Sequence, residues 1–277
     1  MRLIMTRVEL LLVILSFLAS SCVKNVTASN GKAGLTAPFY SADSNHIFCY
    51  VVINAGQVVD NNADSGYLIS ALGAFADSVS KNAVTIEHVA INSRVLNPAS
   101  IGIFEMGYSD STGTLAEGVA LAGTDDVVRI TGNTSGDTLT QVVTVPKFLL
   151  RKTTDFPSAS GPGAIDNSKD LDLNWVADPN PSTDGVAIHV YYMAGLSRSV
   201  NPALPGNVNS LQFTVPDNGT YTIPASAMGN FPKGCYVEID IRRQSLVAAA
   251  VLPLSHRRIF FAGISSLTTT PLQVGGQ

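Results

Sequence analysis

The chain has 277 residues, with 17 Lys and Arg against 21 Asp and Glu, which gives a formal net charge of −4. An acidic balance argues against nucleic acid as a partner and against electrostatic docking to an anionic membrane. Charged residues make up only 14% of the chain, against about 25% in an average soluble domain. This shortfall is typical of secreted β proteins with neutral, polar surfaces.

The first residues have the features of a secretory signal. Arg2 and Arg7 give a basic start, and an apolar run extends from Leu10 to Leu18. A charged start, a short apolar centre and small residues at the exit are the parts of such a signal. The apolar run is about half of the ~20 residues that a membrane-spanning helix needs. We therefore expect residues 1–21 to be a signal peptide.

The signal ends in Leu18-Ala-Ser-Ser-Cys22, which resembles the lipobox of bacterial lipoproteins. In that family the signal is cut before the cysteine, which then carries the acyl chains. Ala19 stands where Leu is commoner. The resemblance implies lipidation at Cys22 and a place in the bacterial cell envelope, with the outer membrane expected and the periplasmic or surface face left open. Residues 22–38 are small and polar and are expected to form a tether from this lipid.

The region 39–152 contains short β-rich runs, at 101–108, 126–131 and 139–145, with turn-forming residues between them. Such a pattern predicts a β-sandwich or barrel and not an α/β unit. Residues 67–75 are the one segment where we expect a helix, although the same residues could form a strand.

Residues 153–168 contain the Pro, Gly and Ser cluster of a linker. A second β series follows, in which Leu171, Leu173 and Trp175 share one face of a strand. Two further β-rich runs flank Pro216-Asp-Asn-Gly219, where Asn-Gly is a strong signal for a hairpin. We therefore predict a second β domain over 169–277.

Three stretches of this second half carry a family resemblance: Leu171-Asp-Leu-Asn-Trp175, Asp217-Asn-Gly-Thr-Tyr-Thr-Ile-Pro224 and Asn230-Phe-Pro-Lys-Gly234. They resemble the immunoglobulin-like or fibronectin-III-like sandwiches of secreted and lipid-anchored proteins of Bacteroidota-type bacteria, over about residues 169–264. The resemblance implies a fold and not a reaction. The expected fold is all-β, with two tandem β-sandwich (immunoglobulin-like) domains after a lipoprotein signal peptide.

No motif for catalysis or cofactor binding stands out. The four histidines, His46, His88, His189 and His256, lack zinc-ligand spacing. There is no nucleophile elbow and no Gly-rich phosphate loop. We expect no catalytic residue, no cofactor and no metal ion.

One acidic loop is a weak calcium candidate. Asp60, Asn62 and Asp64 have the alternating oxygen spacing that lets a loop wrap Ca²⁺. However, Gly66 is one position late for an EF-hand loop, and Ala71 stands where the bidentate Glu belongs. Since Asn and Asp also form turns, a plain polar loop is the favoured interpretation.

With Cys22 assigned to lipid, Cys49 and Cys235 remain. Both stand at apolar positions of alternating runs, where a free cysteine behaves as a small buried hydrophobe. Two core thiols are the favoured interpretation, and a disulfide between them is the alternative.

These observations predict a non-catalytic, lipid-anchored protein of the cell envelope that serves as an interaction or structural module. Its expected ligand is a protein or a glycan. Its expected contact with the membrane is the N-terminal lipid. The alternative is a fibre subunit, because the fimbrial proteins of Bacteroidota-type bacteria are also lipoprotein precursors that assemble by strand donation. Residues 265–277 could supply such a strand or form a frayed end. A hydrolase acting on glycan or peptide is the third hypothesis. The oligomeric state stays open.

Overall fold

The computed structural model describes residues 48–59, 66–76, 86–100, 103–152, 156–157, 165–178, 185–197, 210–254 and 258–275. The predicted signal peptide, the tether, Cys22 and the calcium candidates Asp60, Asn62 and Asp64 lie outside these ranges. Within them, no helix is long and apolar enough to cross a membrane.

Strands dominate the described chain, as the all-β prediction requires. The strands are β1 (Phe48–Val59), β2 (Gly66–Ala76), β3 (Ile86–Ile91), β4 (Arg94–Val95), β5 (Asn97–Ser100), β6 (Ile103–Tyr108), β7 (Asp125–Gly132), β8 (Thr138–Thr144), β9 (Leu171–Asn174), β10 (Val186–Tyr192), β11 (Ser210–Val215), β12 (Thr220–Ile223), β13 (Tyr236–Val251), β14 (Arg258–Thr269) and β15 (Leu272–Gln273). The helices are short: η2 (Asp110–Thr112), α2 (Leu115–Leu121), α3 (Ala194–Ser197) and α4 (Ala225–Met228).

The helix expected over 67–75 is wrong, since these residues belong to β2. Ile69, Ala71 and Phe75 are buried in one core. Their spacing follows the two-residue period of a strand, whose alternate side chains point to the same face.

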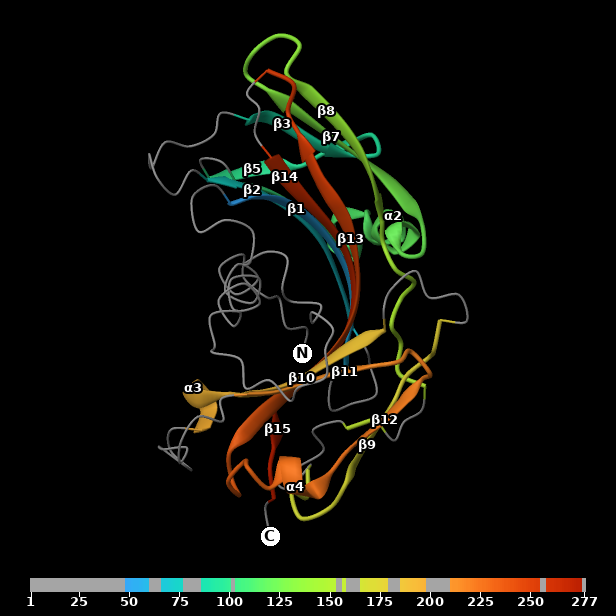
Figure 1. Cartoon of the computed structure of the whole chain (residues 1–277), viewed down its shortest axis with the longest axis vertical. Coiled ribbons are helices and arrows are strands. Elements are labelled where there is room, and N and C mark those ends of the chain that lie inside the picture. The colour runs from blue at the N-terminus through green and yellow to red at the C-terminus, as the bar shows by residue number, and fades with distance from the viewer. Residues whose placement is uncertain are drawn as a thin grey trace. The chain divides into compact units, whose positions relative to one another are not determined.

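The large sheet has the strand order β11-β10-β13-β14-β1-β2-β6-β5, with β15 beside β13. Its pairs are antiparallel except for β1 and β14, which are parallel. Figure 1 shows β1, β13 and β14 running side by side. Two smaller sheets have the orders β4-β3-β7-β8 and β12-β9.

Two apolar clusters lie on one face of the large sheet, which we call its inner face. The first core joins residues of β1, β2 and β6 to residues of the four-stranded sheet, such as Val89 and Ile130. The second core joins residues of β10 and β13 to β9 and β12, including Leu173 and Ile223. Trp175, which the alternation of β9 predicts to face inward, is fully buried in the second core.

Long strands contribute to both cores. Val51 of β1 and Phe261 of β14 lie in the first core, whereas Val59 and Leu267 of the same strands lie in the second. Strands from both predicted domains, 39–152 and 169–277, therefore share one hydrogen-bonded sheet. The division into two domains with a linker at 153–168 stays a prediction.

Most of the described residues considered as a donor strand or frayed end lie in β14 and β15 of this sheet. Leu267 is in β14, Leu272 is in β15, and both are fully buried, as is Val274. Pro271 falls between the two strands, at a point where no ladder hydrogen bond is required of it.

Candidate functional site

A belt of buried polar side chains separates the two cores on the inner face of the large sheet. It consists of Arg243 and Ser245 on β13, Ser265 on β14 and Gln57 on β1, each less than 9% exposed. We call these four residues the polar belt. On β13 they continue the alternation that points Ile241 into the second core.

The polar belt binds the backbone of residues 144–151, which we call the crossing segment. At its start, the Ser245 hydroxyl donates a hydrogen bond to the Thr144 carbonyl. Gly263 of β14 lies directly beneath, where an added Cβ would collide with the same carbonyl and come within 2.8 Å of the Val145 Cα. The crossing segment therefore packs directly against the backbone of β14.

Further along, the belt satisfies two backbone donors. The Leu149 N–H donates to Ser265 Oγ at 2.7 Å, and the Arg151 N–H donates to Gln57 Oε1 at 3.0 Å. A buried backbone N–H without a partner costs free energy, so these side chains help to hold the crossing segment against the large sheet.

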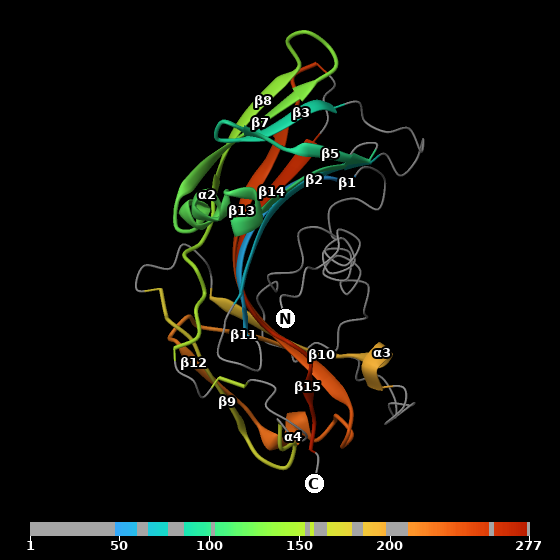
Figure 2. The ribbon, with the colours of Figure 1, turned by 180° about the vertical axis from the view of Figure 1, so that it is seen from behind.

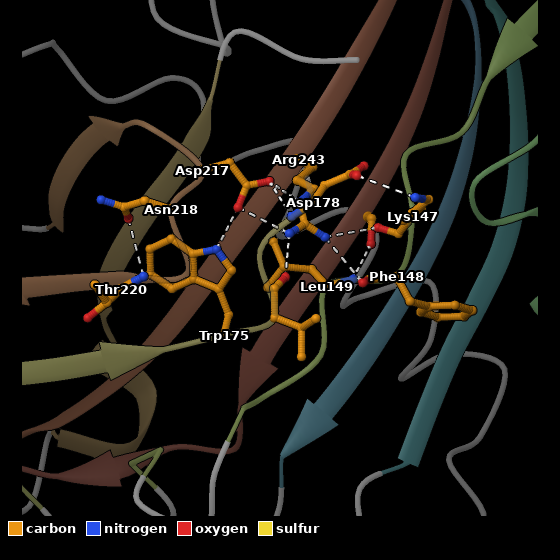
Figure 3. Close-up of polar contacts among 11 residues, drawn as sticks. Lys147, Phe148, Leu149, Trp175, Asp178, Asp217, Asn218, Thr220 and Arg243 are labelled. Atoms are coloured by element: carbon orange, nitrogen blue, oxygen red, sulfur yellow. Dashed lines mark hydrogen bonds and ion pairs between the residues drawn. The ribbon is translucent and has the colours of Figure 1, made fainter. Parts of the chain in front are cut away.

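Arg243 makes the largest number of polar contacts in the belt, and Figure 3 shows it beside Asp217 and the crossing segment. Its Nε donates to Asp217 Oδ2 at 2.6 Å, and its Nη2 donates to Asp217 Oδ1 at 3.1 Å. Nη1 donates to the carbonyls of Lys147 and Phe148 at 3.3 and 3.2 Å, and Nη2 also donates to the Val176 carbonyl at 2.5 Å. One guanidinium thus joins β13, the crossing segment and the chain after β9.

The Asp217 carboxylate is fully buried. Burial acts to raise its pKa, but hydrogen bonds from Arg243 and from the Trp175 indole outweigh burial and hold the pKa below its ordinary value. The Trp175 Nε1 donates to Oδ1 at 2.8 Å. The pair is therefore charged at neutral pH and has its hydrogen-bonding capacity directed to structural partners.

This arrangement overturns the hairpin predicted at Asn218-Gly219. β11 pairs with β10 and β12 pairs with β9, so the two strands belong to different sheets. The turn between them crosses from one layer of the second core to the other. Asp217 in that turn points inward to Arg243, a long-range contact that the local Asn-Gly signal does not encode.

A second charged cluster lies on the opposite, outer face of the large sheet. Glu238, Asp240 and Arg242 alternate with core residues along β13, and β10 places His189 opposite Asp240 and Tyr191 opposite Glu238. We call these five residues the outer row. Sequence alternation alone predicts exposed side chains here, yet His189 is 6% exposed and Asp240 is fully buried.

The outer row is internally bonded. Arg242 forms an ion pair with Asp240, which also accepts a hydrogen bond from the Thr268 hydroxyl at 2.9 Å. His189 Nδ1 lies 2.5 Å from the Tyr191 hydroxyl, while its Nε2 is buried without a hydrogen-bond partner.

Burial shifts two groups of the outer row in opposite senses. Burial, with a smaller effect of Arg242, lowers the pKa of His189 to about 4. Burial, with repulsion from Asp240, raises the pKa of Glu238 to about 7. A carboxyl that titrates near neutrality suits proton transfer, although structural ion-pair networks produce the same shift. If the chain were a hydrolase, this row would be its first candidate site.

The third feature is the outermost strand, β11. Among the described strands it pairs only with β10. Its residues Ser-Leu-Gln-Phe-Thr-Val carry no charge and no proline. Proline, charge and bulges are the devices that keep an edge strand from pairing with another strand, and β11 has none of them.

The remaining expected residues are placed as follows. Cys235 is a free, buried thiol, as predicted, and burial raises its pKa to about 11. Cys49 is the second residue of β1. Within the described ranges, no three His, Cys, Asp or Glu side chains are arranged to hold a metal ion.

Comparisons with known proteins do not assign the chain to a family. No family model matches the chain, and no curated protein is similar enough to count as a relative.

Proposed function

We propose that this protein is a lipid-anchored interaction module of the bacterial cell envelope with no catalytic activity of its own. The observation that carries the proposal is the end position of β11 in the large sheet, where it pairs only with β10 among the described strands and carries no charge and no proline. Strand edges and loops on a rigid β framework are common binding surfaces, because they vary without disturbing the core.

The hydrogen bonds within the polar belt and the outer row support a structural role for their charged side chains. Arg243 directs its donors to Asp217 and to three carbonyls, and Asp240 bonds to Arg242 and Thr268. Groups committed to such bonds stabilise a fold more readily than they turn over a substrate.

Anchoring rests on the lipobox-like sequence ending in Cys22. Cys22→Ser should abolish incorporation of a labelled fatty acid and should move the full chain from the membrane fraction to the soluble fraction. Cys49→Ser is the matched control and should leave both properties unchanged. Incorporation of the labelled fatty acid into the Cys22→Ser variant would contradict lipidation at Cys22.

Binding itself is tested with the full chain extracted in detergent and immobilised. We expect saturable retention of a defined envelope protein or glycan, and no turnover on a panel of glycosides, esters and peptides. Turnover that Glu238→Gln abolishes would overturn the proposal and assign a hydrolase to the outer row.

A fibre subunit is the second candidate, and the same β11 edge favours it, because strand donation requires a strand able to accept a neighbour. β14 ends at Thr269 and β15 covers Leu272–Gln273 in the protein's own sheet, while Val274 bridges to Ile165, so another segment would have to act as donor. Light scattering after size-exclusion chromatography, over a range of concentrations, separates the two candidates: ladders support a fibre, and monomers at every concentration exclude it.

A further inference from the structure

We infer that Asn218 is a site of spontaneous deamidation in the folded protein, where the side-chain amide is converted to a mixture of aspartate and isoaspartate. The reaction takes place within one pair of residues and uses only water as a co-reactant. It goes beyond the proposed interaction function and does not depend on it, because it needs neither a ligand nor a partner protein.

The covalent change begins at the peptide bond that follows Asn218. The Gly219 nitrogen loses its proton to a solvent base and attacks the Asn218 Cγ, so that an N–Cγ bond forms. The Cγ–Nδ2 bond then breaks, and the amide nitrogen takes a proton from solvent and leaves as ammonia. Water opens the resulting succinimide ring at either of its two carbonyls. One opening gives aspartate, and the other gives isoaspartate, in which the main chain runs through the former side chain.

Asn218 lies in the turn 216–219, which joins β11 of the large sheet to β12 of the two-stranded sheet. Figure 2 shows both strands. The pairing of β11 with β10 ends at Val215, and the pairing of β12 with β9 begins at Thr220. Asn218 is therefore outside both ladders, and it is exposed. Water can reach the amide carbon at which the reaction takes place.

Two features of the turn prepare this amide for attack. The Asn218 side chain folds back along its own backbone, where Oδ1 accepts a hydrogen bond from the Thr220 N–H at 3.3 Å (Figure 3). A donor directed at this oxygen stabilises the negative charge that develops on it when Cγ is attacked. The attacking nitrogen belongs to Gly219. Because glycine has no Cβ, no side chain of that residue hinders the approach, and holding both groups in one turn makes the attack unimolecular.

Asn92 shows how the fold can prevent the same chemistry. It is also exposed, and a small residue, Ser93, follows it. However, its Nδ2 donates to Asp126 Oδ1 at 3.0 Å, and its Oδ1 accepts from the Val127 N–H at 2.9 Å. Both ends of that amide are thus fixed to β7. In the described part of the chain, no hydrogen bond holds the Asn218 Nδ2, which is the nitrogen that leaves.

The modification would act on the polar belt through its neighbour in the chain. Asp217 precedes Asn218 directly and binds Arg243 through both carboxylate oxygens. On the other side, the Gly219 carbonyl accepts a hydrogen bond from the Trp175 N–H at 2.9 Å. Isoaspartate would add one carbon to the main chain between these two anchored residues. We therefore expect the isoaspartate form to unfold at a lower urea concentration than the unmodified protein.

The test incubates the full chain, extracted in detergent, at mildly alkaline pH and compares it with a free peptide of residues 213–222. Mass spectrometry of digested samples locates the conversion, and labelling by an isoaspartyl methyltransferase identifies isoaspartate. We expect Asn218 to react in the folded chain at no less than about a tenth of the rate in the peptide, a restraint of no more than about 1.4 kcal/mol. The exposed residues Asn92, Asn133 and Asn230 serve as controls within the same sample and should react more than about tenfold slower than Asn218.

Asn218→Gln is the matched variant, since it keeps an exposed amide but requires a larger ring for the same attack. It should lose the conversion at position 218, and after parallel incubation it should keep its urea midpoint while that of the wild type falls. A folded chain that stays unmodified at Asn218 while the peptide and the urea-unfolded chain react would overturn the inference, because the fold would then protect the pair. Equal conversion at Asn92 and Asn218 would overturn the role given to their hydrogen bonds. Equal urea midpoints for the modified protein and the variant would refute the effect on the polar belt.

Discussion

Arg243 places a full charge in the protein interior, and the free energy of that charge depends on its partners. Removing the charges of Arg243 and its partner Asp217 from water is costly. The attraction between them offsets this cost only when the surrounding hydrogen bonds are also made. Here five donor contacts from one guanidinium reach Asp217 and three carbonyls. The loss of either charged partner would leave the other charge buried and unpaired.

We predict that Arg243→Met lowers the free energy of unfolding by about 3–5 kcal/mol, because Asp217 is left as an uncompensated buried charge. Arg243→Met combined with Asp217→Asn should recover part of that loss. Urea unfolding followed by far-UV circular dichroism measures both. Arg129→Met, at an exposed position of β7, is the control and should change stability little. An Arg243→Met variant as stable as this control would refute the role assigned to the pair.

The outer row predicts a pH dependence in which two groups oppose each other. His189 has its pKa lowered from 6.5 to about 4, so between these values the unfolded chain binds the proton and stability rises with pH. Glu238 has its pKa raised from 4.5 to about 7, so the folded chain binds the proton and stability falls as pH rises. Between pH 4.5 and 6.5 the two contributions cancel.

Single substitutions should separate these contributions. From pH 4.5 to 6.5, the stability of Glu238→Gln relative to the wild type should rise by about 1.4 kcal/mol per pH unit, and that of His189→Gln should fall by a similar amount. Urea unfolding at several pH values measures both slopes. Parallel curves for the wild type and the two variants would show that neither group is perturbed.

At the scale of elements, the crossing segment depends on one glycine. A side chain at position 263 would displace the Thr144 carbonyl and the Val145 backbone from β14. We predict that Gly263→Ala costs about 1–3 kcal/mol, as overpacking commonly does. Thermal unfolding provides the measurement.

The control for this change is Gly107→Ala on β6. Gly107 is exposed, and an added Cβ there would meet nothing within 4 Å. It should leave the melting temperature nearly unchanged. Equal effects at the two positions would mean that the crossing segment does not pack tightly on β14.

Sequence reasoning recovered the β class of the elements but not their pairing. Alternation at Leu171, Leu173 and Trp175 correctly predicts an inward face, because burial on one side of a strand is a local property. The strand at 67–75 was ambiguous, since small residues such as Gly73 and Ala74 fit a helical and an extended pattern equally well. The Asn-Gly turn was misassigned because the strands on either side of it, β11 and β12, pair with β10 and β9 and not with each other.

The candidate sites show the same limit. The polar belt comes from β1, β13 and β14, so no local motif contains it. Gln57 and Ser265, for example, are ordinary polar residues within strands until the fold places them opposite backbone donors. The place of β11 at the end of the described sheet also depends on strand order. Long-range pairing therefore decided what a single sequence left undetermined.

At the scale of the whole described chain, the shared strands predict cooperative unfolding of the two cores. Trp175 is the only tryptophan and lies in the second core. Ile130 is fully buried in the first core, and Ile130→Ala should cost about 2–5 kcal/mol. Because β1 and β14 contribute to both cores, this change should lower the urea midpoint reported by Trp175 fluorescence as much as that reported by circular dichroism.

Val127→Ala supplies the control, since Val127 neighbours Ile130 on β7 but is 39% exposed, and it should shift neither midpoint. Coincident shifts in Ile130→Ala would mean that a perturbation of the first core is transmitted through the large sheet to the core beside the β11 edge. A Trp175 midpoint that stays at the wild-type value, while circular dichroism reports an earlier transition, would mean that the sheet can separate at the polar belt. The two predicted domains would then be independent folding units despite their common strands.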